Sequence, residues 1–498
     1  MTRMNPTLAL ALRRLLPLAA VAALPACSLA PTYQKPGLDP LPAAYAGQTQ
    51  DGLWSPAQPA DTASRGPWWS VYDNAELDRL ERQLDAANPS LSVALARYDA
   101  ARAVVGEVRS DLYPHLGVEA STLRNRQSDN RPLRGSNQPN EYSANTLGFG
   151  ASYELDLWGR VRNEVAAGKA DEAAAAGDLA SVKLSLEAQL ADQYVRLRGY
   201  DVQARILKDT LDAYRQGLDL TQRRFQGGVA SGLDVSRAKT QWSDAMAQVS
   251  EVGAQRALTE HAIASLVGES ASSFSLPPSE TPMNVPSIPL GVPSLLLQRR
   301  PDIAASERRV FAANAQIGVA RAAFFPRLSL SAVFGWQNTG MGSLLSAGNR
   351  YWALGPDLAM SLFDGGLRHA KVQAAQANLD AAAGQYRETV LGAFQQVEDN
   401  LTLLQQLGKE AQEQDDAASS ARDSQTIATN RYREGAVNYL DVVSAQTATL
   451  QAERSAEQVR TRRLQASVDL IRALGGGWDR SDLPNSDTAM TASAASAR

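Results

Sequence analysis

The chain has 498 residues and carries 49 Lys and Arg against 53 Asp and Glu, which gives a formal net charge of −4. This nearly balanced charge, without a basic patch studded with aromatic residues, argues against a nucleic-acid-binding protein. A single cysteine excludes an intrachain disulfide bond.

Residues 1–26 have the pattern of a bacterial export signal. Two arginines precede an apolar run from Leu15 to Leu24, and this run is shorter than the ~20 residues that a membrane-spanning helix needs. The following Pro25-Ala26-Cys27 resembles the end of a lipobox, which implies cleavage before Cys27, attachment of lipid (palmitate) to it and, with Ser28 next, sorting to the outer membrane. The alternative is an ordinary cleaved signal followed by an incidental cysteine.

Residues 27–73 are expected to form an extended, lipid-anchored N-terminal segment. Beyond it, the longer apolar stretches are interrupted by charged or amide side chains, so no transmembrane helix is predicted. If the chain spans a membrane, it must therefore do so with strands.

An internal repeat is the most informative feature of the sequence. The segment from Arg224 to Val235 matches the segment from Arg431 to Val442 at an offset of 207 residues. Upstream, Pro114 matches Pro326 at an offset of 212, and each of the two prolines follows an aromatic residue. Small insertions account for the difference between the two offsets.

The repeat divides the mature chain into two similar units. We expect a first repeat over 74–268, a linker over 269–290, a second repeat over 291–478 and a disordered tail over 479–498. Each repeat is predicted to contain a helix, two β-strands around a polar loop, and two long helices joined by a turn with glycine.

The strands are predicted from strict alternation. From Leu147 to Leu157 the odd positions are apolar, and the even positions are glycine, serine or acidic. Residues 116–121, 328–336 and 352–362 alternate in a similar way, although Pro356 in the last segment suggests a bend or an unpaired ladder position. Aromatic residues gather near the segment ends, as in the girdles of transmembrane strands: Tyr113, Trp158, Phe325, Trp336, Trp352 and Phe363. A soluble sandwich with one hydrated face is the alternative.

Four strands in lipid require association with other copies, because they cannot close a barrel and an open edge leaves backbone groups unpaired. Two copies give eight strands, whose interior side chains fill. Three copies give twelve strands, enough for a lumen, so a conduit favours a homotrimer. The fold class predicted is thus mixed α and β, with long antiparallel helices and a twelve-stranded transmembrane β-barrel.

Long helical stretches complete each repeat. Val161 to Gln226 and Leu367 to Arg433 have few helix breakers, and each would extend roughly 100 Å at ~1.5 Å per residue. The shorter stretches after the turns, 233–266 and 440–474, are expected to pair with the helices before the strands, 91–112 and 302–324. A hollow ring of helices and an ordinary bundle with a filled core remain equally open on periodicity alone.

Several collinear motifs resemble those of the TolC-like outer-membrane factors, closest to the OprM/NodT-type efflux lipoproteins. They are the segment 295–303 with Glu307, the start at 27–33, and the segments 153–160, 322–326 and 473–478. The resemblance covers essentially the whole mature chain before the tail. It implies a trimer with a twelve-stranded barrel, a periplasmic helical tunnel and an equatorial collar, docked to a periplasmic adaptor and an inner-membrane pump of the resistance-nodulation-division class.

The most specific motif has a structural interpretation. Proline suits the first turn of a helix, and an acidic residue beside it favours the positive helix end. We therefore expect this signature to be structural and not catalytic: Arg299, Arg300, Pro301, Asp302 and Glu307.

The two turns with glycine join the helix ends farthest from the strands, so they lie at the periplasmic tip. The second turn presents Tyr439, Leu440 and Asp441, and a trimer would repeat each residue three times around the axis. In the family, related positions close the tunnel. Leu440 matches the apolar constriction, whereas Ser444 stands where OprM-like members have an acidic residue, so Asp441 is the alternative source of a negative ring.

Further gate candidates lie beside these positions. Arg431 and Tyr432 are expected to bridge to a neighbouring coiled coil, and Leu233 and Asp234 are the counterparts of Leu440 and Asp441 in the first repeat. Helix capping is the equally weighted alternative for the two aspartates.

No enzyme, metal or cofactor site is predicted, apart from the covalent lipid on Cys27. The three histidines, His115, His261 and His369, lie in different predicted elements without metal-ligand spacing, and no phosphate-binding glycine loop occurs. The predicted function is an outer-membrane efflux duct for drugs or small toxic compounds. The alternatives are a duct for type I protein secretion and a lipid-anchored coiled-coil protein without a pore.

Overall fold

The computed structural model describes residues 28–37, 45, 54–56, 67–128, 130, 139–279, 281, 283–290 and 299–478. The expected signal segment, Cys27 and the expected C-terminal tail therefore lie outside the described residues.

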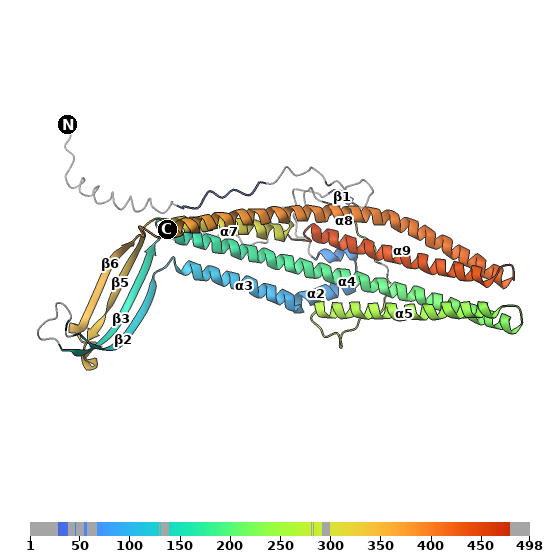
Figure 1. Ribbon diagram of the computed structural model, residues 1–498, viewed down its shortest axis with the longest axis horizontal. Coiled ribbons are helices and arrows are strands. Elements are labelled where there is room, and N and C mark those ends of the chain that lie inside the picture. The colour runs from blue at the N-terminus through green and yellow to red at the C-terminus, as the bar shows by residue number, and fades with distance from the viewer. Residues whose placement is uncertain are drawn as a thin grey trace, which may run out of the picture.

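The molecule is elongated, with long helices along its length and a sheet at one end (Figure 1). The helices are α2 (Ala75–Ala87), α3 (Pro89–Ser110), α4 (Arg160–Gln226), α5 (Gly232–Leu266), α7 (Pro301–Ala322), α8 (Leu367–Arg433) and α9 (Tyr439–Ala473), with the short 3-10 turns η3 (Trp68–Tyr72), η5 (Met341–Ser343) and η6 (Ala347–Asn349). The strands are β1 (Trp54–Pro56), β2 (His115–Arg126), β3 (Glu141–Leu155), β4 (Ile288–Leu290), β5 (Arg327–Asn338) and β6 (Arg350–Ala359).

The two repeats have helices of equal length. Helices α4 and α8 contain 67 residues each, and α5 and α9 contain 35 each. The first repeat begins with two helices rather than one, because Asn88 interrupts the helical stretch before Pro89 and caps α3 by accepting a hydrogen bond from the Leu91 N–H. In the expected linker, β4 pairs in parallel with β1.

The short helices meet end to end instead of pairing side by side. Helices α3 and α5 follow one another along α4, and α7 and α9 follow one another along α8 (Figure 1). At the first joint, Asn88 Nδ2 donates to the Leu266 carbonyl at 2.7 Å, and at the second, Arg300 Nη1 donates to the Ala473 carbonyl at 3.1 Å. Each joint thus satisfies a backbone carbonyl at a helix C-terminus.

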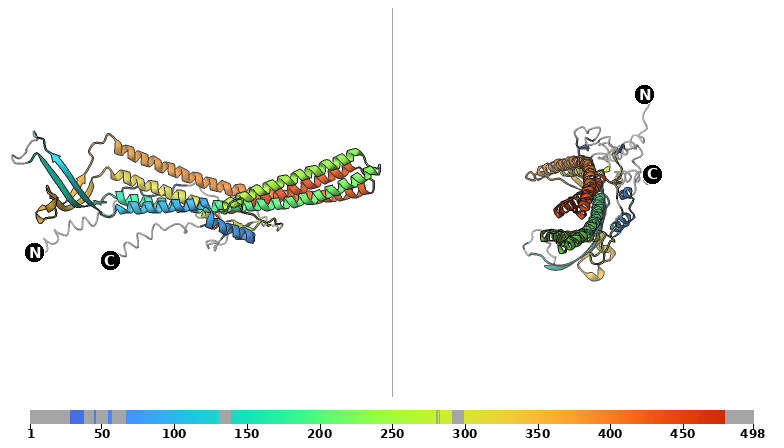
Figure 2. Two further views of the ribbon diagram at one scale, coloured as in Figure 1. Left: turned by 90° about the horizontal axis from the view of Figure 1, so that it is seen from below. Right: turned by 90° about the vertical axis from the view of Figure 1, so that its right-hand side faces the viewer.

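The long helices form a single curved layer, with α2 on its convex side (Figure 2). The largest apolar core lies near mid-length, where α2, η3 and the C-terminal part of α9 pack on α4 and α8. Leu190, Tyr194 and Leu197 of α4 are buried there. Among the described residues, no helix is both long enough and apolar enough to cross a lipid bilayer.

The four long strands form one antiparallel sheet in the order β2-β3-β5-β6, so the two predicted hairpins join through β3 and β5. The register places Val118, Phe149, Phe334 and Trp352 in one row across the sheet. Pro356 lies inside β6, an edge strand of the sheet, where proline is tolerated.

Candidate functional site

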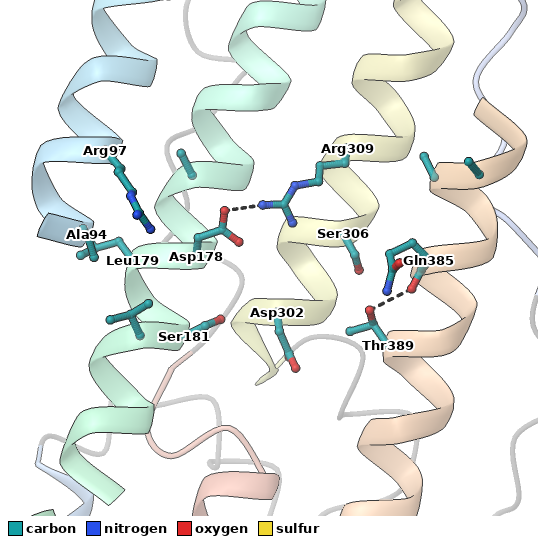
Figure 3. A pocket seen from close by; sticks show the side chains of 14 residues that line it. Ala94, Arg97, Asp178, Leu179, Ser181, Asp302, Ser306, Arg309, Gln385 and Thr389 are labelled. Carbon is teal, nitrogen blue, oxygen red and sulfur yellow. Dashed lines mark hydrogen bonds and ion pairs between the residues drawn. The ribbon is translucent and has the colours of Figure 1, made fainter. Parts of the chain in front are cut away.

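One face of the helical layer forms a wall that combines small and apolar side chains with charged ones. A hollow of about 860 Å³ extends across α3, α4, α7 and α8 (Figure 3). On it, the guanidinium of Arg309 on α7 pairs with the carboxylate of Asp178 on α4. Its lining is Ala94, Arg97, Ala175, Asp178, Leu179, Ser181, Val182, Asp302, Ser306, Arg309, Ala381, Ala382, Gln385 and Thr389.

The N-terminal segment 28–37 covers the opposite face of α7. Tyr33 Oη donates to Glu307 Oε1 at 2.7 Å, Asn314 Nδ2 donates to the Pro31 carbonyl at 2.8 Å, and Arg321 Nη1 donates to the Leu29 carbonyl at 3.3 Å. These three α7 residues are spaced by seven and share one helix face, whereas Asp302 and Arg309, which line the hollow, lie on a different face of the helix. The segment therefore runs along the outside of the wall.

The sheet exposes a broad apolar face. Along the strands, Leu116, Val118, Phe149, Trp352 and Leu354 point to the same side, and all five are exposed, Leu116 by 82% and Trp352 by 75%. An exposed apolar surface that runs across several strands marks contact with a membrane or a partner. The other face carries Gly117, Gly150, Ser152, Ser331 and Gly355.

At the far end, each long hairpin turns through a glycine. Gly228 has φ +76° and Gly435 has φ +79°, a region that side-chain-bearing residues rarely adopt. The following N–H groups return to the helix, from Val229 to the Arg224 carbonyl and from Ala436 to the Arg431 carbonyl, each at 2.8 Å. The two tips therefore have the same backbone path.

Three of the gate candidates share one exposed helix face at the second tip. Leu440, with 44% of its surface exposed, lies beside Asp441 and one turn before Ser444, and the latter two are also exposed. Arg431 is exposed as well. Tyr439 was expected to expose its side chain at the tip, and this prediction is wrong. The Tyr439 side chain is 2% exposed and packs against Tyr432, because this first residue of α9 faces the other hairpin.

In the first tip, Leu233 is 58% exposed, and Asp234 completes a capping box. The Asp234 carboxylate accepts from Ser231 N at 3.2 Å and from Ser231 Oγ at 2.7 Å, while Ser231 Oγ accepts from Asp234 N. The capping interpretation therefore accounts for this carboxylate. At the second tip Asn438 caps instead, accepting from Asp441 N at 3.3 Å, which leaves the Asp441 carboxylate without a capping role.

The sequence interpretation missed the contact that joins the two tips. Arg224 Nη1 donates to the Tyr432 carbonyl at 2.7 Å and Nη2 donates to the Arg433 carbonyl at 3.3 Å, while its guanidinium lies 4.6 Å from the centre of the Tyr432 ring. The sequence did contain a signal for this contact, because Arg224 is the repeat counterpart of Arg431, which was named as a gate candidate.

The signature residues lie at the second helix joint and beneath the N-terminal segment. Pro301 begins α7, and Arg300 makes 3.0 and 2.6 Å contacts to the Asp302 carboxylate and also binds the Ala473 carbonyl. Glu307 is 3% exposed and binds Tyr33 and Arg308. The partly buried Arg299 contributes the backbone carbonyl against which Gly475 packs.

The described residues contain no group of three or more His, Cys, Asp or Glu arranged to hold a metal ion. His115 lies in β2, His261 in α5 and His369 in α8, where the His369 ring contacts the edge of Phe324.

Comparison with known proteins identifies the architecture. The family model "Outer membrane efflux protein" matches residues 80–269 and 292–476. The outer membrane protein OprJ of Pseudomonas aeruginosa is 34% identical over 459 residues, covering 91% of this chain and 94% of OprJ. The toluene efflux pump outer membrane protein TtgC of Pseudomonas putida is 34% identical over 456 residues, covering 91% of this chain and 93% of TtgC.

A solved structure of the outer-membrane channel OprN superposes with a TM-score of 0.83 at 30% identity, covering 91% of this chain and all of that chain. These matches confirm the resemblance to TolC-like factors that the motifs indicated. The chain therefore belongs to the outer membrane efflux protein family, whose members are efflux channels of the outer membrane.

Proposed function

We propose that this chain works as a homotrimeric exit duct in a tripartite efflux system, with a periplasmic adaptor and an inner-membrane pump of the resistance-nodulation-division class as its partners. The observation that carries the proposal is the combination of an open four-stranded sheet, apolar on one face, with a curved helical layer that carries a hollow lined by small, apolar and charged side chains. Passage through such a duct needs no enzymatic activity, no nucleic acid and no cofactor beyond a lipid anchor.

The open edges of the sheet support the trimer. Strands β2 and β6 each have a neighbour on one side only, and in lipid an unpaired backbone group costs several kcal/mol. Pairing β6 of one copy with β2 of the next satisfies both edges. Three copies close a twelve-stranded barrel with a lumen, whereas eight strands leave an interior that side chains fill.

The position of Ser28 supports the lipid anchor on Cys27. Ser28 Oγ donates to Asn163 Oδ1 at 2.9 Å, and Asn163 lies in the first turn of α4, close to where β3 ends. A lipid on the preceding residue would thus enter the membrane at the junction between sheet and helices. That level is the periplasmic boundary expected if the sheet spans the bilayer.

Native mass spectrometry of the detergent-purified mature protein tests the trimer and the anchor together. The expected spectrum shows three copies, each cut before Cys27 and carrying covalent lipid. A monomer would contradict the barrel, and an unmodified Cys27 would contradict the anchor. The two outcomes are independent of one another.

The names of the relatives support small toxic compounds as the cargo. Curated relatives at 30–34% identity are efflux pump proteins for antibiotics, toluene and solvents. We expect deletion of this gene to increase susceptibility to such compounds. Deletion of the pump with which it works should have the same effect, and deletion of both should increase susceptibility no further than either single deletion. Unchanged susceptibility together with loss of a secreted protein would favour type I secretion instead.

The exposed face at the second tip supports a closure at the periplasmic end. In a trimer Leu440 would form an apolar ring and Asp441 an acidic ring, with Ser444 one turn further along the bore. The intrachain contact of Arg224 with the end of α8 suggests how Arg431 acts: by the 207-residue repeat, its counterpart contact is with the end of α4 in the next copy, beside Phe225.

Conductance in planar bilayers tests the closure. The double variant Leu440→Ala with Asp441→Ala is expected to raise the mean current, since it removes both rings. A matched double variant at positions exposed on α9 away from the tip, Gln451→Ala with Gln458→Ala, should leave the current unchanged. Equal currents for the tip variant and the wild type would rule out the closure.

A further inference from the structure

A group of four charged side chains lies at the seat of α2 on α4, and we call it the collar cluster: Glu81, Asp85, Lys183 and Glu187. Lys183 Nζ lies 2.8 Å from Asp85 Oδ2 and 3.6 Å from Glu187 Oε1, and Trp68 Nε1 donates to Glu187 Oε2 at 2.9 Å. Glu81 is 0% exposed, and neither of its carboxylate oxygens has a hydrogen-bond partner.

The collar cluster contains three carboxyl groups and one ammonium group. Arg82 on α2 lines the same hollow as the cluster but pairs with Asp78. Neither η3 nor the segment 474–478 brings a charged side chain. A buried carboxylate without a partner is strongly unfavourable, and such a group takes up a proton instead. Burial, and next the nearby Glu187 and Asp85, raise the pKa of Glu81 to about 10. Burial likewise raises the pKa of Glu187 to about 7.

We propose that the collar cluster is a proton-dependent latch. Helix α2 stays packed on α4 while the cluster holds its protons, and release of those protons to water weakens this packing. Solvent reaches the cluster through a hollow of about 450 Å³ that Trp68, Asp85, Lys183 and Glu187 help to line. The latch acts on a joint of the fold, because α2 leads directly into Asn88, which holds α3 against the end of α5.

The direction of the effect follows from proton linkage. Both carboxyls titrate higher in the folded protein than the ordinary value of 4.5, so the folded state binds more protons than the unfolded state above that pH. Their stabilising protonated form is fully present below about pH 4.5. Stability is lost as pH rises, through both carboxyls up to about pH 7 and through Glu81 alone up to about pH 10.

The test is the thermal unfolding midpoint of the full-length, detergent-purified protein between pH 5 and pH 9. For wild type the midpoint should fall as pH rises. Glu81→Gln, which copies the protonated carboxyl, should match wild type at pH 5 and exceed it increasingly towards pH 9. The exposed control Glu107→Gln on α3 should follow the wild-type curve. Parallel curves for Glu81→Gln and wild type would overturn the proposal.

A second variant keeps the test decisive if Glu81→Gln does not accumulate. Lys183→Met removes the only cation of the cluster, which lowers the pKa of both carboxyls in wild type. In the variant both pKa values should rise further, so the loss of stability should still begin near pH 4.5 but continue to higher pH and be larger at pH 9. If the unfolding midpoint of Lys183→Met depended on pH as that of wild type does, the cluster would not control the packing of α2 on α4. Neither result depends on whether the protein conducts or exports any compound.

Discussion

Replacing Gly475 with alanine is expected to destabilise the fold by about 3–5 kcal/mol, because it adds backbone strain to a steric overlap that the backbone cannot relieve. Gly475 has φ +92°, and a methyl group built on it would overlap the backbone carbonyl of Arg299. The chain there closes the joint between α9 and α7, where Arg300 donates to the Ala473 carbonyl. The thermal unfolding midpoint and the yield of folded protein should both fall sharply.

A matched substitution separates this joint from a general effect of adding a methyl group. Gly253 lies exposed in α5 with open space around its Cβ position. Gly253→Ala should be neutral or stabilising by up to about 1 kcal/mol, since alanine is the better helix former. If Gly475→Ala unfolded at the same temperature as Gly253→Ala, the tight approach of the two backbones would not be present in the protein.

Asp201→Asn should cost about 3–5 kcal/mol, because it leaves the buried Arg198 guanidinium without its paired carboxylate. It also takes one of two carboxylate partners from the partly buried Arg256, which keeps Glu260. The Asp201 side chain is 1% exposed and lies 2.7 Å from both Arg198 Nη1 and Arg256 Nε. The same two arginines hold the connection between the repeats, by donating to the Pro277 and Leu276 carbonyls at 2.9 and 2.7 Å.

Two measurements report on this network. Thermal unfolding gives the loss of stability, and limited proteolysis should show faster cleavage near residues 276–279 in Asp201→Asn. The exposed Asp209→Asn on the same helix changes the charge equally and should leave both unchanged. Equal behaviour of the two variants would mean that the network does not hold the connection.

Much of the fold could be predicted from the sequence because its signals are periodic and occur twice. The long helices begin and end within one residue of the expected positions, since the glycine turns and the strand ends mark both limits. Alternation predicted the two hairpins and the apolar face of the sheet. Pairing between β3 and β5 was not predicted, because it joins segments from different repeats and leaves no local signal.

Tyr439 at the tip and Glu81 in the collar cluster show which side-chain positions were not predicted from the sequence. Tyr439 follows a turn and was therefore expected at the surface, yet its side chain lies in the contact between hairpins, which depends on their packing. Glu81 appeared to be one of many helix-surface charges. Its spacing from Leu77 and Leu84 places it on the buried face of α2, so helical periodicity contained a signal for it that the sequence analysis did not use.

The equal lengths of the two hairpins restrict how proteins built on this plan can vary. Adding seven residues to each helix of one hairpin would extend it by about 10 Å past its companion. Arg224 would then lie two turns away from the end of α8 that it now binds. Insertions or deletions that preserve this contact must therefore change both hairpins by the same number of residues, so their reach can evolve with the contact intact only in matched steps.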